Sequence, residues 1–286
     1  MYVQYWRANR KTSIVKLIFY KIPNSIQTYF GGRFRFHGIY PLFSLHYKDR
    51  EREREREGTE MPMIVIKYWP ILARASGLFR MCAEAGVEWK HVTTAPVMGA
   101  AFFGAETSNL APPILEDGDV VLSQAVACHQ YLGNKFGFNK NIKIPELAIQ
   151  YMNDLSDLHS EMGDKAIAGK KSNDVHALQE YVMGDRYKRH LQAINRSIKG
   201  PYYFGDEPTY VDFAVCSYLD MCEYKWLLPL VPKSGDTIAK YAPKLKSIYE
   251  KIRSLPSATN NAKINDANPV PPGLVLTPER VATWKD

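Results

Sequence analysis

Cysteine and histidine are the residue types that most often carry thiol exchange or metal ligation, and the sequence holds both. Its cysteines are Cys82, Cys128, Cys216 and Cys222, which form no CxxC pair and lie in apolar, helix-like stretches. The seven histidines are scattered, and none stands at ligand spacing from a cysteine. We therefore expect no metal site, and buried, unreactive thiols in a reducing compartment.

Charge is concentrated near the N-terminus. Residues 1–60 carry 12 basic and 6 acidic residues, whereas the remaining residues carry 25 and 24. The body of the chain is therefore almost neutral, which argues against a nucleic-acid partner. No run of 18 apolar residues occurs, so we expect no membrane-spanning helix.

Residues 1–60 differ from the rest of the chain, and we expect them to lie outside the fold. Residues 1–48 contain eight basic and no acidic residues, and residues 49–57 alternate acidic and basic side chains. The alternating segment 49–57 cannot bury apolar surface and should be a solvated tether. Three interpretations stay open: an organellar transit segment, a basic arm for an acidic surface, or non-native sequence upstream of a start at Met61 or Met63.

From Met61 onward the hydrophobic pattern predicts an α/β layer. The β-branched run at 63–68 is typical of a buried strand. Apolar side chains over 78–85 follow helical spacing, and this helix should end at Gly86. A second strand is expected at 89–92. Strand, helix and strand in this order are the beginning of an α/β unit.

The following segment predicts a hairpin and a further helix. Asp117-Gly118 lies between two short apolar runs, which is a strong signal for a hairpin turn. A helix should then run from about Gln124 to Phe136. The complete order indicates a mixed sheet. Beyond Gly137 the pattern is helical, with helices expected over 144–168, 174–199, 209–228 and 238–254.

Three stretches resemble motifs of the glutathione S-transferase family, of the alpha, mu, pi and sigma type. They are Lys67-Tyr68-Trp69-Pro70 with Arg74 and residues 83–89, then residues 111–119, then residues 122–133. Their order and separations also match the family. The resemblance spans about residues 62–265 and implies a thioredoxin-like N-terminal domain followed by an all-α C-terminal domain. The implied boundaries are 61–139 and 143–266, with a peripheral tail over 267–286.

The resemblance also implies a site for glutathione as co-substrate. In the family, a hydroxyl at the end of the first strand donates a hydrogen bond to the thiolate of glutathione, and Tyr68 matches it. Without the resemblance, Tyr68 is an aromatic anchor of the sheet edge. The implied glutathione contacts are Arg74, Pro112, the cis-proline Pro113, Gln124 and Ala125, with Asp157 as a contact to the second subunit's glutathione. Arg74 fits a structural salt bridge equally well, and Asp157 fits a solvated surface position.

Two residues depart from the family pattern inside this site. Pro112 has no N–H, so one of the two backbone hydrogen bonds to glutathione cannot form. Ala125 stands where the family has a Ser or Thr hydroxyl. A lost hydrogen bond to a charged group costs roughly 1.5–3 kcal/mol, so we expect weaker glutathione binding. The helix N-terminus can still attract a carboxylate.

Thr209 and Asp212 form a capping-box pattern at the start of a buried helix. The family carries the same cap, and we expect its role to be structural.

Two functions remain. The first is a transferase that conjugates glutathione to a small electrophile or reduces a peroxide. The second is a non-catalytic module for dimerisation or scaffolding. A thioredoxin-like oxidoreductase is disfavoured because residues 70–74 contain no cysteine. The resemblance further implies a homodimer with a role in detoxification. We expect a cytoplasmic protein, or an organellar one if residues 1–60 are a transit segment.

Overall fold

The computed structural model describes residues 63–93, 109, 111–172, 176–223, 234–261 and 263–264. They all belong to one compact unit, Ser44–Asp286. The predictions for the leader 1–60 and for the tail 267–286 lie outside the described residues.

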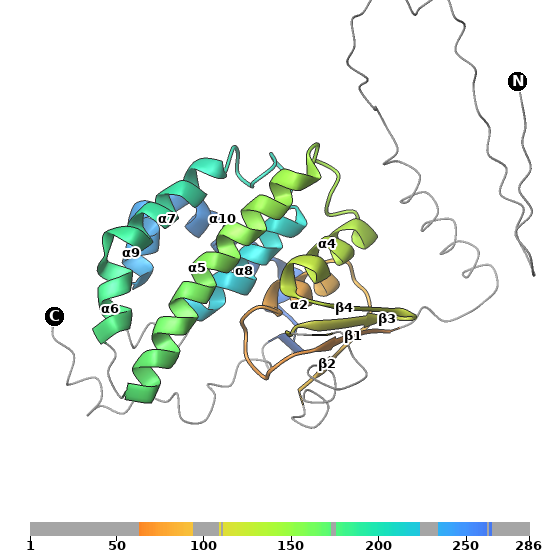
Figure 1. The fold of residues 1–286 in the computed structure, drawn as a ribbon. Coiled ribbons are helices and arrows are strands. Elements are labelled where there is room, and N and C mark those ends of the chain that lie inside the picture. The colour runs from red at the N-terminus through yellow and green to blue at the C-terminus, as the bar shows by residue number, and fades with distance from the viewer. Residues whose placement is uncertain are drawn as a thin grey trace, which may run out of the picture. The chain divides into compact units, whose positions relative to one another are not determined.

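The sheet is built from four strands among the described residues: β1 (Ile64–Lys67), β2 (Trp89–Val92), β3 (Ile114–Asp117) and β4 (Val120–Ser123). Their order across the sheet is β2-β1-β3-β4 (Figure 1). β1 pairs parallel to β2, and β3 pairs antiparallel to both β1 and β4. The predicted mixed sheet is therefore confirmed.

Local sequence explains the strands and their hairpin. β1 alternates buried and half-buried side chains, and Ile64 and Ile66 point into the core. The β3–β4 hairpin turns through Gly118, whose φ of 60° lies in the left-handed region that glycine adopts without strain. The predicted Asp-Gly turn is confirmed.

Helices α2 (Ser76–Glu84) and α4 (Ala125–Phe136) pack together and against α8 (Tyr210–Glu223). Every residue of α2 from Ser76 to Cys82 is buried, so this helix has no solvent-facing stripe over two turns. Both helices end as predicted, before Gly86 and Gly137, which have positive φ.

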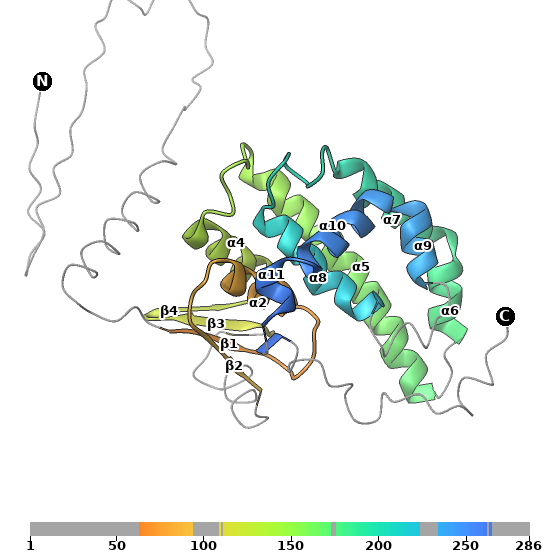
Figure 2. The same cartoon turned by 180° about the vertical axis from the view of Figure 1, so that it is seen from behind.

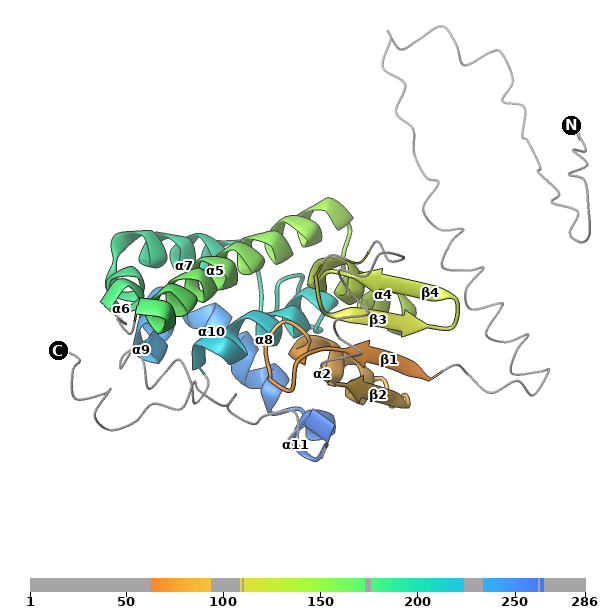
Figure 3. The same ribbon diagram turned by 60° about the horizontal axis from the view of Figure 1, so that its bottom comes forward.

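The remaining helices lie beside the sheet on one side of the unit (Figures 1 and 3). Together with α8 they are α5 (Pro145–Ser172), α6 (His176–Met183), α7 (Asp185–Ser197), α9 (Ser234–Tyr241), α10 (Pro243–Arg253) and α11 (Pro256–Thr259). Helix α11 returns to contact α2 (Figure 2). None of the described helices is long and apolar enough to cross a bilayer.

Two expected helices are each divided in two. The prediction of one continuous helix over 174–199 was wrong. Gly184 separates α6 from α7 with an extended backbone, φ −81° and ψ 165°. The helix expected over 238–254 is divided at Ala242, because Pro243 has no N–H to continue the ladder of α9 and instead starts α10.

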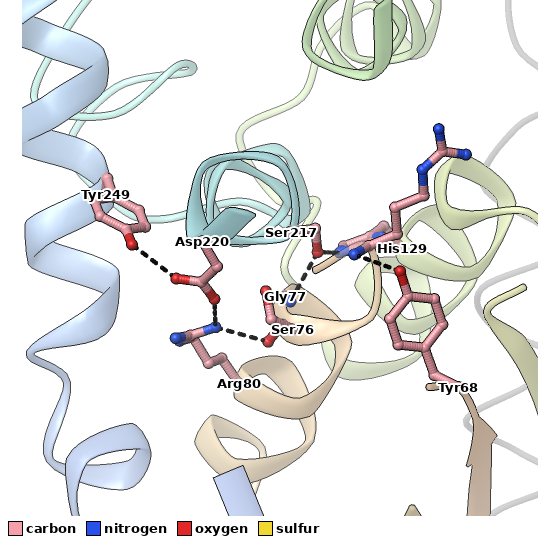
Figure 4. A network of polar contacts seen from close by, with 9 residues as sticks. Tyr68, Ser76, Gly77, Arg80, His129, Ser217, Asp220 and Tyr249 are labelled. Carbon is pink, nitrogen blue, oxygen red and sulfur yellow. Dashed lines mark hydrogen bonds and ion pairs between the residues drawn. The ribbon is translucent and has the colours of Figure 1, made fainter. Parts of the chain in front are cut away.

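A buried ion pair joins α2 to the helical half of the unit (Figure 4). The Arg80 guanidinium donates to the Asp220 carboxylate on α8 at 2.8 Å, and the Tyr249 hydroxyl on α10 donates to its other oxygen at 2.8 Å. The two charged side chains are only 4% and 0% exposed. Arg80 also donates to the carbonyl of Ser76. The apolar residues around these groups form one cluster that runs from β1 to α10.

Candidate functional site

The residues predicted to hold glutathione are brought to one end of the sheet. Lys67 pairs with Ile114, and Ile114 pairs with Ser123. Tyr68, Pro113 and Gln124 are the chain neighbours of these paired residues. They therefore lie together at the same end of the three adjacent strands β1, β3 and β4. Pairing between β1 and β3 therefore places the end of the first motif beside the second.

Tyr68 follows β1 directly and is held on several sides. Its backbone N–H donates to the carbonyl of Val92 at 3.1 Å, and its phenolic oxygen accepts the backbone N–H of Arg74 at 3.1 Å. The side chain is only 4% exposed. Burial raises the pKa of Tyr68 to about 12, against the hydrogen bond and the positive charge of Arg74. The phenol therefore keeps its proton at neutral pH and can act as a hydrogen-bond donor.

Arg74 lies in the turn before α2, two residues before this helix begins at Ser76. Its side chain contacts α5. The guanidinium donates to Nδ1 of His159 at 3.4 Å and to Oγ of Ser160 at 2.9 Å. Both partners are neutral, so the described residues do not provide the structural salt bridge that was the alternative for Arg74.

The second and third motifs meet at the start of α4. The Pro112–Pro113 peptide bond is cis, the conformation that the resemblance implied. Gln124 is exposed, has φ 75° and ψ 129°, and donates its N–H to the carbonyl of Ala111 at 3.2 Å. Backbone strain of this kind costs on the order of 1–3 kcal/mol and concentrates at ligand sites. Gln124 makes no side-chain cap to α4, so the first N–H groups of that helix stay available to an anion.

A hydrogen-bonded relay supports the first turn of α4 (Figure 4). His129 and the carbonyl of Ala125 are joined through Nδ1 at 2.7 Å, and Nε2 of His129 meets Oγ of Ser217 at 3.0 Å. The N–H of Gly77 donates to the same Oγ at 2.8 Å. Because Nδ1 must donate to the carbonyl, Nε2 accepts from the Ser217 hydroxyl. The start of α4 is thus tied to α2 and α8.

The other predicted residues lie apart from these strand ends. Asp157 is exposed on α5, two residues before His159. The Asp212 carboxylate accepts the N–H of Thr209 at 2.7 Å, which is one half of the predicted capping box. The other half does not form, because the N–H of Asp212 donates to the backbone carbonyl of Thr209 at 2.9 Å, while the Thr209 hydroxyl donates to the Asp212 carboxylate at 2.8 Å. Fully buried, Asp212 needs these donors and also accepts the N–H of Tyr203.

One thiol contacts this arrangement, because Sγ of Cys128 donates to the carbonyl of Pro113 at 3.7 Å. Cys82, Cys128 and Cys216 are free and buried, and burial raises the pKa of each of them. They stay protonated at neutral pH and are poor nucleophiles, as predicted. The Cys222 side chain lies outside the described ones. Within the described residues no group of His, Cys, Asp and Glu could hold a metal ion.

Sequence reasoning missed His159, Ser160 and His129. A usable signal existed for the histidines, because each stands on the apolar stripe of a predicted helix and is buried there. Their partners could not be named from the sequence, because Arg74 and Ser217 lie 85 and 88 positions away.

Comparison with known proteins agrees with this architecture. Residues 156–259 match the family model described as the glutathione S-transferase C-terminal domain. A curated glutathione S-transferase of Plasmodium yoelii yoelii is 26% identical over 146 residues, which cover 51% of this chain and 64% of that protein. The chain therefore matches less than two thirds of the length of this relative.

Solved structures agree on the fold. The glutathione S-transferase of Ascaris lumbricoides has a TM-score of 0.54 at 19% identity, covering 69% of this chain and 95% of its own. The Pi-class enzyme of Onchocerca volvulus has a TM-score of 0.53 at 17% identity, covering 71% and 94%. The fold is accordingly a thioredoxin-like sheet with an all-α second part. The match over residues 156–259 and the curated relative support a place for the chain in the glutathione S-transferase superfamily, and the solved structures show that it has the fold of these proteins.

Proposed function

We propose that the chain is a glutathione transferase, in which Tyr68 holds the thiol of glutathione as a thiolate for attack on an electrophile. The observation that carries this proposal is the hydrogen bonding of the phenol. Its oxygen already accepts the Arg74 amide, and burial keeps the phenol protonated. Its own O–H is therefore the group left to donate to a thiolate, and such a bond is worth more away from water.

The remaining contacts are proposed from the same strand ends. We propose that the backbone at Pro112–Pro113 meets the cysteinyl unit, and that Gln124 and the α4 N-terminus meet the γ-glutamyl carboxylate. The strained backbone of Gln124 and the uncapped start of α4 support this placement. Arg74 would act on the thiolate through its charge, and Asp157 would face the second subunit's glutathione.

A second function is favoured by Pro112 and Ala125, which remove a backbone donor and a hydroxyl from the proposed site. A non-catalytic module for dimerisation or scaffolding would tolerate both losses.

The proposal keeps the division into a glutathione-binding domain over 61–139, a helical domain over 143–266 and a tail over 267–286. It also includes a homodimer, a cytoplasmic location and a role in detoxification. Analytical ultracentrifugation of the purified chain tests the oligomeric state.

The test of the function compares the wild-type protein with Tyr68→Phe in a conjugation assay with glutathione and chlorodinitrobenzene. Loss of one preorganised donor should lower kcat/KM by about 100-fold. The matched control is Tyr241→Phe, which removes a hydroxyl at the end of α9 and should leave the rate unchanged. Equal rates in wild type and Tyr68→Phe would remove Tyr68 from the mechanism. No conjugation and no glutathione binding in calorimetry would instead favour the non-catalytic module.

A further inference from the structure

Arg74 is a half-buried cation with neutral partners. Its guanidinium reaches only His159 and Ser160 of α5 among the described residues, at 3.4 and 2.9 Å. Arg80 shows the ordinary alternative in the same protein, because its guanidinium pairs with the carboxylate of Asp220. Buried charges are usually paired in this second way, so the neutral pairing of Arg74 needs a reason.

His159 is held in its neutral form. Its side chain is only 6% exposed, and burial together with the positive charge of Arg74 lowers its pKa to about 3. Nδ1 accepts the Arg74 Nε–H, so the ring proton sits on Nε2. Among the described residues Nε2 has no hydrogen-bond partner. His159 therefore contributes an acceptor without a negative charge.

Among the described residues, therefore, the charge of Arg74 meets no counter-charge. The main chain of Arg74 donates to the phenolic oxygen, and its charge lowers the pKa of Tyr68 against the effect of burial. The other titratable groups that act on this pair come from several elements: His91 on β2 at the Tyr68 carbonyl, Tyr218 on α8, and Cys128 and Asp157 through Tyr218. The Asp157 carboxylate is exposed and makes no ion pair with Arg74.

We propose that His159 is a positioning residue, which together with Ser160 anchors the guanidinium of Arg74 through neutral acceptors, so that its positive charge remains available to stabilise the thiolate of glutathione bound at Tyr68. This inference rests on the proposed transferase function. A carboxylate at position 159 would hold the same guanidinium equally well, but it would cancel the charge that the thiolate needs.

The matched pair His159→Asn and His159→Asp tests the proposal. Both side chains have the same shape and both offer Arg74 an oxygen near the place of Nδ1, so the main difference between them at this contact is the negative charge. The measurement is the pH titration of the ultraviolet absorbance of the glutathione thiolate bound to the full-length protein. His159→Asn should titrate like wild type. His159→Asp should raise the pKa of the bound thiol by about one unit, so that the thiolate fraction at neutral pH falls by up to about tenfold.

Equal thiol pKa values in the Asn and Asp variants would overturn the proposal, because a merely structural role of His159 predicts no difference between them. If His159→Asp does not fold, Ser160→Asp places the same charge on the other acceptor of Arg74, and Ser160→Asn is its control. A normal thiol pKa in Ser160→Asp would count equally against the proposal. Failure of the proposed function is distinguishable, because the wild-type protein itself would then show no bound thiolate.

Discussion

Removal of the Asp220 charge would leave Arg80, the buried cation of α2, without its charged partner. Asp220→Asn preserves the shape of the side chain and an oxygen for the Tyr249 hydroxyl, so the change is confined to the ion pair. Two unit charges about 4 Å apart attract each other by roughly 4 kcal/mol at an effective dielectric constant of 20. Breaking one side of a buried pair costs about 3–5 kcal/mol, because the remaining ion cannot return to water.

Urea unfolding followed by tryptophan fluorescence measures this loss. The urea midpoint should fall with the slope unchanged. The corresponding loss of free energy of unfolding, about 3–5 kcal/mol, is a third or more of the total for a typical domain. The double variant Arg80→Met with Asp220→Asn removes both charges and keeps an acceptor for Tyr249. It should be more stable than Asp220→Asn alone by about 2 kcal/mol.

Either of two results would refute this reasoning. A loss below about 1 kcal/mol in Asp220→Asn would mean that the unpaired guanidinium of Arg80 reaches water. A double variant less stable than Asp220→Asn would mean that packing, and not the unpaired charge, sets the loss.

Two further predictions concern the contacts of α4. Burial lowers the pKa of His129 from 6.5 to about 4, so the folded state resists protonation of this ring. The stability that is present above pH 6.5 should be lost as the pH falls toward 4, by up to about 3 kcal/mol. Urea midpoints should fall less steeply over this range in His129→Gln, and parallel curves for the two proteins would contradict the prediction. Gly133→Ala should cost about 2–3 kcal/mol, because the added Cβ would lie 2.3 Å from Cδ1 of the buried Tyr210, and an unchanged melting temperature would show that α4 and α8 can separate freely.

Short-range patterns predicted the strands and most helix ends. The β-branched run before Tyr68, the Asp117-Gly118 turn and the terminal glycines Gly86 and Gly137 each encode their structure within a few residues. Gly184 shows the limit of such patterns. Apolar spacing continues across it, and nothing local distinguishes a glycine inside a helix from one that separates two helices.

The candidate site was predictable where a motif defines it and unpredictable where it depends on distant pairing. Tyr68, Pro113 and Gln124 were named from the sequence, and strand register places them at one end of the sheet. The acceptors of Arg74 were not, because the contact joins a turn before α2 to the middle of α5. Arg80 and Asp220 did carry a signal, since each charge is flanked by apolar residues within its helix.

The burial of α2 on all sides has a consequence for how this protein can be divided and how it can change. One face of the helix completes the α/β layer, while Gly77 and Arg80 bind α8 in the helical half. A fragment that contains the sheet with α2 and α4 but lacks the helical half would expose this second face of α2 to solvent, together with the unpaired guanidinium of Arg80. The two halves should therefore unfold in a single thermal transition. They should also evolve together, because a helical half taken from a relative would have to supply its own counterparts of Ser217 and Asp220.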